Sequence, residues 1–310
     1  MSNRKKAIFL LILTSLCFAL MSTFMKLATD IPSLEKAFFR NVISFIIASF
    51  LFIKYVKGEV ESRAKEENKS KRELIKEIAS PKSPKLLFAR AVAGTLGVTL
   101  NYQAIDYLPL ADSSVLQKLS PFYTIIFSYF LLKENITRKQ IVCIAFAFIG
   151  CVIAVGPQFS SSSGPYMMGI LGAGAAGLAY TFIRMLGLRG ENGKLIILTF
   201  SFLSLVFIFP MMIGNYVPLV GVNLLYVVLG SLCATGAQLS LTKAYSLAPS
   251  KEISIYEYTQ PLFAAVLGLV FFGTLPTMIN IIGFIIIIGS AIMLYVDIPF
   301  LKKDKENKVI

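Results

Sequence analysis

The feature that most constrains this chain is a series of long apolar stretches that contain almost no charged residue. At about 1.5 Å of rise per residue, a helix of about 20 residues crosses the ~30 Å hydrocarbon core of a bilayer. Of the 310 residues, 56% are hydrophobic and 15% are charged, and the mean hydropathy is +0.73. Because the charges cluster between the apolar stretches, the sequence predicts an all-α integral membrane protein.

Charged residues, proline, glycine and asparagine divide the apolar stretches into ten predicted transmembrane helices. The basic run before the first stretch is also typical of a cleavable signal peptide, but Met25 and Lys26 follow where small residues would mark a cleavage site, so this stretch is expected to be retained. The ten helices are expected over residues 7–28, 33–55, 86–107, 110–133, 139–156, 166–188, 194–214, 223–246, 252–273 and 276–296.

Ten spans place both termini on one side, and the basic residues predict which side that is. All of the 30 lysines and arginines except Lys26, Lys36, Arg40 and Lys118 fall in tails, loops or span ends on the side of the termini. Because cytoplasmic loops carry an excess of basic residues, we expect a multi-pass protein of the cytoplasmic membrane with both termini in the cytoplasm.

The longest loop, residues 57–83, mixes both signs of charge and carries no catalytic pattern. It is expected either to be a solvated connector or to place a short helix from Arg72 to Ile78 on the membrane surface, with Leu74 and Ile78 facing the lipid.

An internal repeat organises the chain. Residues 104–140 align without a gap onto residues 244–280, and a weaker echo relates the first and sixth spans. Each half contains five spans, so the second half must enter the membrane inverted, as is common in secondary transporters. The predicted organisation is a first repeat at 1–156, a linker at 157–163, a second repeat at 164–297 and a cytoplasmic tail at 298–310.

The residues that mark the repeat also carry a family resemblance. They are Pro109, Ala111, Pro121, Leu132, Glu134, Ile136 and Thr137, the second copy Ala248, Pro249, Tyr256, Tyr258, Pro261 and Gly273, and the EKAFFR segment from Glu35 to Arg40. The layout resembles the EamA type of the drug/metabolite transporter superfamily, and EKAFFR and KENIT are similar to the branch with bacterial S-adenosylmethionine carriers. The resemblance implies a ten-span metabolite carrier. The second copy departs from the family pattern because Thr274 follows Gly273 where a glutamate is usual.

Ionisable groups inside a span cost ~2.5–3.5 kcal/mol on insertion scales, so those that remain are candidates for function. Glu257, Lys118 and Arg40 lie within spans, whereas Lys26, Arg90, Arg184 and Lys243 are expected to reach the headgroup region. The repeat aligns Gln117 and Lys118 with Glu257 and Tyr258, and a proline four residues after Gln117 and after Glu257 frees a backbone carbonyl beside each. Glu257 is expected to bind substrate or a proton, or to pair with a basic residue for structure alone.

Polar side chains on one face of the eighth span predict a path, and the alternative is bonding between neighbouring helices. They are Ser231, Thr235, Gln238, Thr242 and Tyr245, and the third span repeats them in part with Thr95, Asn101 and Tyr102. Glycines at 94, 97, 172, 174 and 177 are expected to allow close helix approach. The predicted substrate-binding residues are Arg40, Asn101, Tyr102, Gln117, Lys118, Tyr180, Thr235, Gln238, Glu257 and Tyr258.

The sequence contains no phosphate-binding loop, no nucleophile with a base and no metal-ligand cluster, and histidine is absent. We therefore expect no enzymatic activity, no cofactor and no metal, but a secondary transporter that moves an amino acid, an S-adenosylmethionine-like or a nucleoside-like solute by alternating access. The alternative is a membrane-embedded enzyme or lipid-handling protein that uses Glu257; a channel would need rings of like residues.

The expected partners are a small-molecule substrate and membrane lipid, with protons as the candidate coupling ion and no nucleic acid. The chain is expected to be a monomer or a homodimer.

The charge distribution generates a topology prediction. A cysteine introduced at Ser161 should react with an impermeant thiol reagent added to intact cells, and one at Ser70 should not. Labelling at Ser70 without labelling at Ser161 would reverse the orientation.

Overall fold

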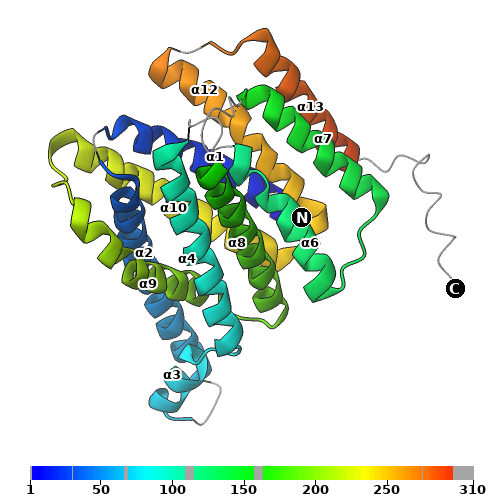
Figure 1. Cartoon of the computed structure of the whole chain (residues 1–310). Helices are drawn as coiled ribbons and strands as arrows, with labels where there is room; N and C mark the ends of the chain where they lie inside the picture. The colour runs from blue at the N-terminus through cyan, green and yellow to red at the C-terminus, as the bar shows by residue number, and fades with distance from the viewer. Residues whose placement is uncertain are drawn as a thin grey trace, which may run out of the picture.

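The computed structural model describes residues 2–29, 31–65, 69–108, 115–156, 163–273 and 275–295, and all regular structure in these segments is helical (Figure 1). Ser161, Pro109, Ala111, Thr274 and the tail at 298–310 lie outside the described residues. The helices of the first half are α1 (Asn3–Leu27), α2 (Ser33–Arg63), α3 (Lys71–Ala79), α4 (Pro84–Tyr107), α6 (Ser120–Leu132) and α7 (Arg138–Val155). Those of the second half are α8 (Ser163–Leu188), α9 (Gly193–Met212), η1 (Ile213–Asn215), α10 (Gly221–Leu247), α11 (Ser250–Ile253), η2 (Ser254–Thr259), α12 (Gln260–Phe272) and α13 (Met278–Tyr295).

Eight helical segments of the described chain are long and apolar enough to cross a membrane, and Met278–Leu294 is a shorter apolar helix. The remaining predicted span is α4, whose 24 residues are long enough but include Lys85, Arg90 and Asn101. The prediction of an all-α, multi-pass membrane protein is confirmed. The eight segments are Asn3–Leu27, Ser33–Arg63, Val115–Leu132, Arg138–Val155, Ser163–Leu188, Gly193–Met212, Gly221–Leu247 and Ser250–Phe272.

Local sequence signals set several helix ends. Thr137 and Gln140 form a reciprocal capping box at the start of α7, and Gly156 ends that helix with φ +61°. Gly273 ends α12 in the same left-handed conformation, φ +65°.

The second helix is longer than predicted, because α2 continues beyond residue 55 to Arg63. Its last turns carry Val56 and Val60, which pack with the buried Leu74 of α3. A capping box of Ser70 and Glu73 starts α3. The loop therefore contains the expected short helix, but Leu74 packs against α2 rather than facing outward.

The helix contacts repeat between the two halves. α1 packs on α10 as α8 packs on α4, α4 packs on α9 as α10 packs on α2, and α6 packs on α8 as α12 packs on α1. The α7–α13 and α2–α9 pairs join equivalent helices, and α7 and α13 lie side by side at one edge of the bundle (Figure 1). This exchange of partners is what a two-fold relation between five-helix halves predicts.

The two ends of the bundle are packed differently. We call the end where α1 begins and α10 finishes the closed end, and the end where α1 finishes and α10 begins the open end. Much of the largest apolar cluster lies toward the closed end and includes Leu11, Ile183, Leu241 and Ile253, each fully buried. Polar contacts reinforce this end, because Arg184 Nε lies 3.5 Å from Glu134 Oε1. The open end instead contains the cavity described next.

Candidate functional site

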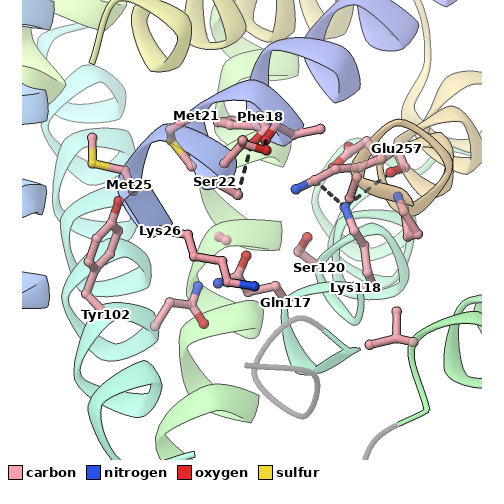
Figure 2. A pocket seen from close by; sticks show the side chains of 18 of the residues that line it. Phe18, Met21, Ser22, Met25, Lys26, Tyr102, Gln117, Lys118, Ser120 and Glu257 are labelled. Carbon is pink, nitrogen blue, oxygen red and sulfur yellow. Dashed lines mark hydrogen bonds between the residues drawn. The ribbon is translucent and has the colours of Figure 1, made fainter. Parts of the chain in front are cut away.

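A cavity of about 700 Å³ lies among α1, α2, α4, α8 and α12 and extends to the open end of the bundle (Figure 2). Its lining includes Leu275, which is 76% exposed, at the loop between α12 and α13. Deeper in the bundle it reaches Glu257 and Arg90, which are 6% and 2% exposed. A volume of this size is typical of a small-molecule site.

A proline-broken helix forms one wall of the cavity. Pro261 has no N–H to donate to the carbonyl of Glu257, and the chain from Ser254 to Thr259 is a 3-10 helix between α11 and α12. The Nζ of Lys118 donates to that carbonyl at 3.2 Å and to Oε1 of Gln260 at 2.6 Å (Figure 2). The Glu257 carbonyl also accepts from the Gln260 N–H, so Lys118, which comes from the other half, is its second donor.

The opposite contact completes a reciprocal link between the halves. Tyr258, the residue that the repeat aligns with Lys118, donates from its hydroxyl to the Lys118 carbonyl at 2.8 Å. Pro121 has no N–H for the Gln117 carbonyl, as Pro261 has none for the Glu257 carbonyl, so a proline lies beside the linked residues in each half. Each half thus donates a side-chain hydrogen bond to the backbone of the other.

The carboxylate of Glu257 has a protein partner. The hydroxyl of Tyr245 donates to Glu257 Oε1, and the Tyr245 ring stacks on Tyr180 at 5.4 Å between centroids. Tyr180 lines the cavity and Tyr245 lies behind it. Tyr245 therefore holds the carboxylate in place, and Glu257 itself borders the cavity.

The structure brings together all but two of the predicted binding residues. Thr235 and Tyr258 are buried and are not among the described residues that line the cavity. Thr235 Oγ1 lies 2.8 Å from Ser44 Oγ and donates to the Ser231 carbonyl, which favours a structural role. The predicted residues that do line it are Arg40, Asn101, Tyr102, Gln117, Lys118, Tyr180, Gln238 and Glu257.

The polar face of the eighth predicted span does not form a continuous path. Of its five side chains, only Gln238 lines the cavity. Ser231 donates to the Val227 carbonyl within α10, and Tyr245 holds Glu257. The interpretation of this face as a path is therefore corrected, because most of it bonds neighbouring helices or its own backbone.

Two of the predicted glycine contacts are close helix approaches. A Cβ at Gly97 would lie 3.0 Å from the backbone nitrogen of Ala176, and one at Gly172 would lie 2.8 Å from Asn101 Oδ1. These distances are shorter than ordinary van der Waals contact. The glycines therefore let α4 and α8 approach directly beside the cavity.

Sequence reasoning missed Arg90. It was expected to reach the headgroup region, and this is wrong, because Arg90 is 2% exposed and lines the cavity. Its guanidinium lies 4.2 Å from the centroid of the Phe200 ring. The available signal was Gly94, one turn later, which the sequence assigned to helix packing: a side chain there would overlap Arg90 Nη1. Gly94 makes room for the arginine.

Comparison with known proteins identifies the family. The model of the EamA-like transporter family matches residues 5–156 and 164–296. The pseudopaline exporter CntI of Pseudomonas aeruginosa is 28% identical over 296 residues, which cover 94% of this chain and 96% of that protein. Solute carrier family 35 member G1 of Homo sapiens is 23% identical over 299 residues, covering 91% of this chain and 77% of that protein.

Two further matches also span most of this chain. An uncharacterized transporter of Helicobacter pylori is 27% identical over 306 residues, which cover 95% of each chain. One crystal structure superposes with a TM-score of 0.76 at 13% identity, covering 93% of this chain and 96% of that one. At this identity the superposition shows the fold alone.

The position of Gln238 generates a prediction. Its Nε2 is buried with no hydrogen-bond partner in the described part of the chain. Gln238→Leu should therefore impair transport with little loss of folded protein, because it removes a solute contact and leaves no protein group unpaired. Proteoliposome flux and the yield of monodisperse protein measure the two effects.

The matched control is Thr235→Val on the same helix, which removes a bond to α2. We expect it to lower stability by ~0.6 kcal/mol or more and to leave transport per folded molecule unchanged. If Gln238→Leu instead lowers the yield and spares transport, Gln238 is structural.

Proposed function

Because the chain belongs to the EamA-like transporter family, we propose that it is a secondary active transporter that moves a small polar metabolite across the cytoplasmic membrane by alternating access. The observation that carries the proposal is a cavity that extends from one end of the bundle to mixed charges at its centre while the other end is closed. A carrier stopped in one of its two open conformations has this form.

The distribution of basic residues supports an orientation for this conformation. Under the positive-inside rule the closed end, which carries the N-terminal basic run and the loops around α3, faces the cytoplasm. The cavity then opens to the outside. Contacts that must break for inward opening include Arg184–Glu134, the 3.3 Å contact between Arg4 Nε and Glu252 Oε2, and the 3.1 Å bond from Ser128 to Ser250.

The paired helix contacts support the proposed exchange between conformations. Since α1–α10 and α8–α4 are equivalent interfaces, a small rearrangement of one half relative to the other could close one end and open the other. We propose that the halves, 1–156 and 164–297, alternate in this way. The CntI relative is named as an exporter, which favours export as the direction to test first.

Flux through purified protein tests the function. A panel of radiolabelled amino acids, nucleosides and S-adenosylmethionine would be offered to proteoliposomes with and without a pH gradient. We expect counterflow of at least one solute without chemical change. Recovery of a chemically altered product would favour an enzyme instead.

Glu257 tests how movement is driven. We expect Glu257→Gln, which mimics the protonated acid, to abolish accumulation driven by a pH gradient while exchange of substrate for substrate continues. If Glu257 instead binds a substrate ammonium group directly, the substitution should weaken binding and exchange together. Wild-type behaviour in both assays would contradict both roles.

Glu134 gives the closed end a pH dependence. Burial raises the pKa of the Glu134 carboxyl, and the charge of Arg184 opposes this to a smaller extent. With the pKa raised, Glu134 loses its charge at a higher pH than an exposed glutamate does. Acidification should therefore weaken the Arg184–Glu134 pair and favour opening at this end.

The measurement is the reactivity of a cysteine placed at Ser250, which is fully buried at the closed end. Its labelling rate is divided by the rate in the Glu134→Gln background, which cancels the pH dependence of the thiol. We expect this ratio to rise toward one as the pH falls. Glu77→Gln is the control, since Glu77 is an exposed residue of α3. A ratio independent of pH would argue against a role for the Arg184–Glu134 pair in opening this end.

A further inference from the structure

Arg90 carries a buried charge that the protein does not neutralise. Its Nε and Nη1 atoms are buried without a hydrogen-bond partner in the described residues. Neither Arg90 nor Arg40, which also lines the cavity, forms an ion pair with a carboxylate within the part of the chain that the structure describes. A charge in a membrane interior is expensive unless a partner or a polar cavity compensates it.

The side chain of Arg90 points away from the nearer headgroup region. Residue 90 lies in the second turn of α4, which begins at Pro84 at the closed end. The guanidinium extends along the helix over Gly94, in the direction of the open end, and lies on the face of Phe200. Gly94 therefore leaves room for the guanidinium, and the Phe200 ring lies against it. Together they hold the guanidinium plane at the cavity wall.

Other groups in the cavity do not balance this charge. Arg40, which is also basic, lines the same cavity. Glu257 is the one acidic residue among the described lining residues, and Tyr245 bonds its carboxylate. Glu35, on the same helix as Arg40, accepts from the backbone of Val217 at 3.0 Å instead. The basic residues of the lining are Lys26, Lys36, Arg40, Arg90 and Lys118.

We propose that Arg40 and Arg90 form an anion site that binds carboxylate groups of the transported solute, so that the substrate is an organic acid or amino acid with at least two carboxylates. This deepens the proposed function and rests on it. A planar guanidinium matches a carboxylate in a two-point fork, and the stacked Phe200 presents Arg90 in a fixed plane. The second arginine and Lys118 leave positive charge for a second carboxylate.

Binding can be measured without transport. The purified full chain, with Cys17 and Cys233 replaced by alanine, is heated in detergent with a thiol-reactive dye that reports exposure of the buried Cys143 and Cys151. The probes are glutarate, citrate and nitrilotriacetate, each at matched ionic strength. Glutaramide, the uncharged analogue of glutarate, and glycerol 3-phosphate are the comparison probes. We expect at least one carboxylate to raise the unfolding midpoint by a few degrees and glutaramide to have no effect.

Variants separate binding from folding. Arg90→Gln should weaken carboxylate binding at least about tenfold, while the ligand-free midpoint stays equal or rises because an unpaired buried charge is removed. Gly94→Ala should weaken binding too, since its Cβ displaces the guanidinium. Arg40→Gln is an independent second variant. The control is Arg189→Gln, whose arginine lies at the closed end and donates to Ser83 at 3.3 Å.

The outcomes distinguish this inference from the transport proposal. The anion site would be overturned if no carboxylate stabilises the protein, if glutaramide stabilises it equally, or if glycerol 3-phosphate alone does so. Undiminished carboxylate binding in both Arg90→Gln and Arg40→Gln would overturn it as well. If the protein transports an uncharged solute in proteoliposomes and Arg90→Gln does not reduce that flux, the anion site is overturned but the transport proposal is not. Specific carboxylate binding without flux of the bound probe or of any panel solute would support the site and contradict transport.

Discussion

The centre of the molecule depends on two reciprocal hydrogen bonds: Lys118 Nζ donates to the Glu257 carbonyl, and the Tyr258 hydroxyl donates to the Lys118 carbonyl. Pro261 has no N–H to donate to the Glu257 carbonyl, and Lys118 supplies a donor from the other half. Inside a membrane an unpaired ammonium group would be costly, and the Glu257 carbonyl, which also accepts from the Gln260 N–H, gives Lys118 an acceptor.

This arrangement explains why the cavity wall is irregular. A continuous helix would bond every backbone group internally and present only side chains to a solute. The 3-10 segment at Ser254–Thr259 instead turns Glu257 toward the cavity while Tyr258 is fully buried. Adjacent residues point about 120° apart on a 3-10 helix, so Glu257 faces the cavity while Tyr258 forms the link between the halves.

Periodicity and charge placement predicted most of the architecture because a bilayer imposes strict length and charge limits on each helix. The repeat also aligned Gln117 and Lys118 with Glu257 and Tyr258, the residues that the structure brings together. It could not assign Thr235 or Arg90 correctly. Hydroxyls suit both a wet path and a helix contact, and the direction in which an arginine extends depends on neighbours from other helices, here Phe200 of α9. Such contacts are long-range, and no local pattern encodes them.

The repeat is imperfect at the two ends, and the imperfection has an energetic consequence. The offsets of the repeat match Arg184 with Lys26 and Glu134 with Thr274. Arg184 meets Glu134 at the closed end, whereas Lys26 at the open end lies over the Phe272 ring at 4.5 Å and its matched residue is a threonine, which does not ionise. Closing the open end would therefore not form the equivalent ion pair. If the halves alternate as proposed, this asymmetry favours the conformation observed in the empty protein, and the solute supplies the free energy that favours the other one.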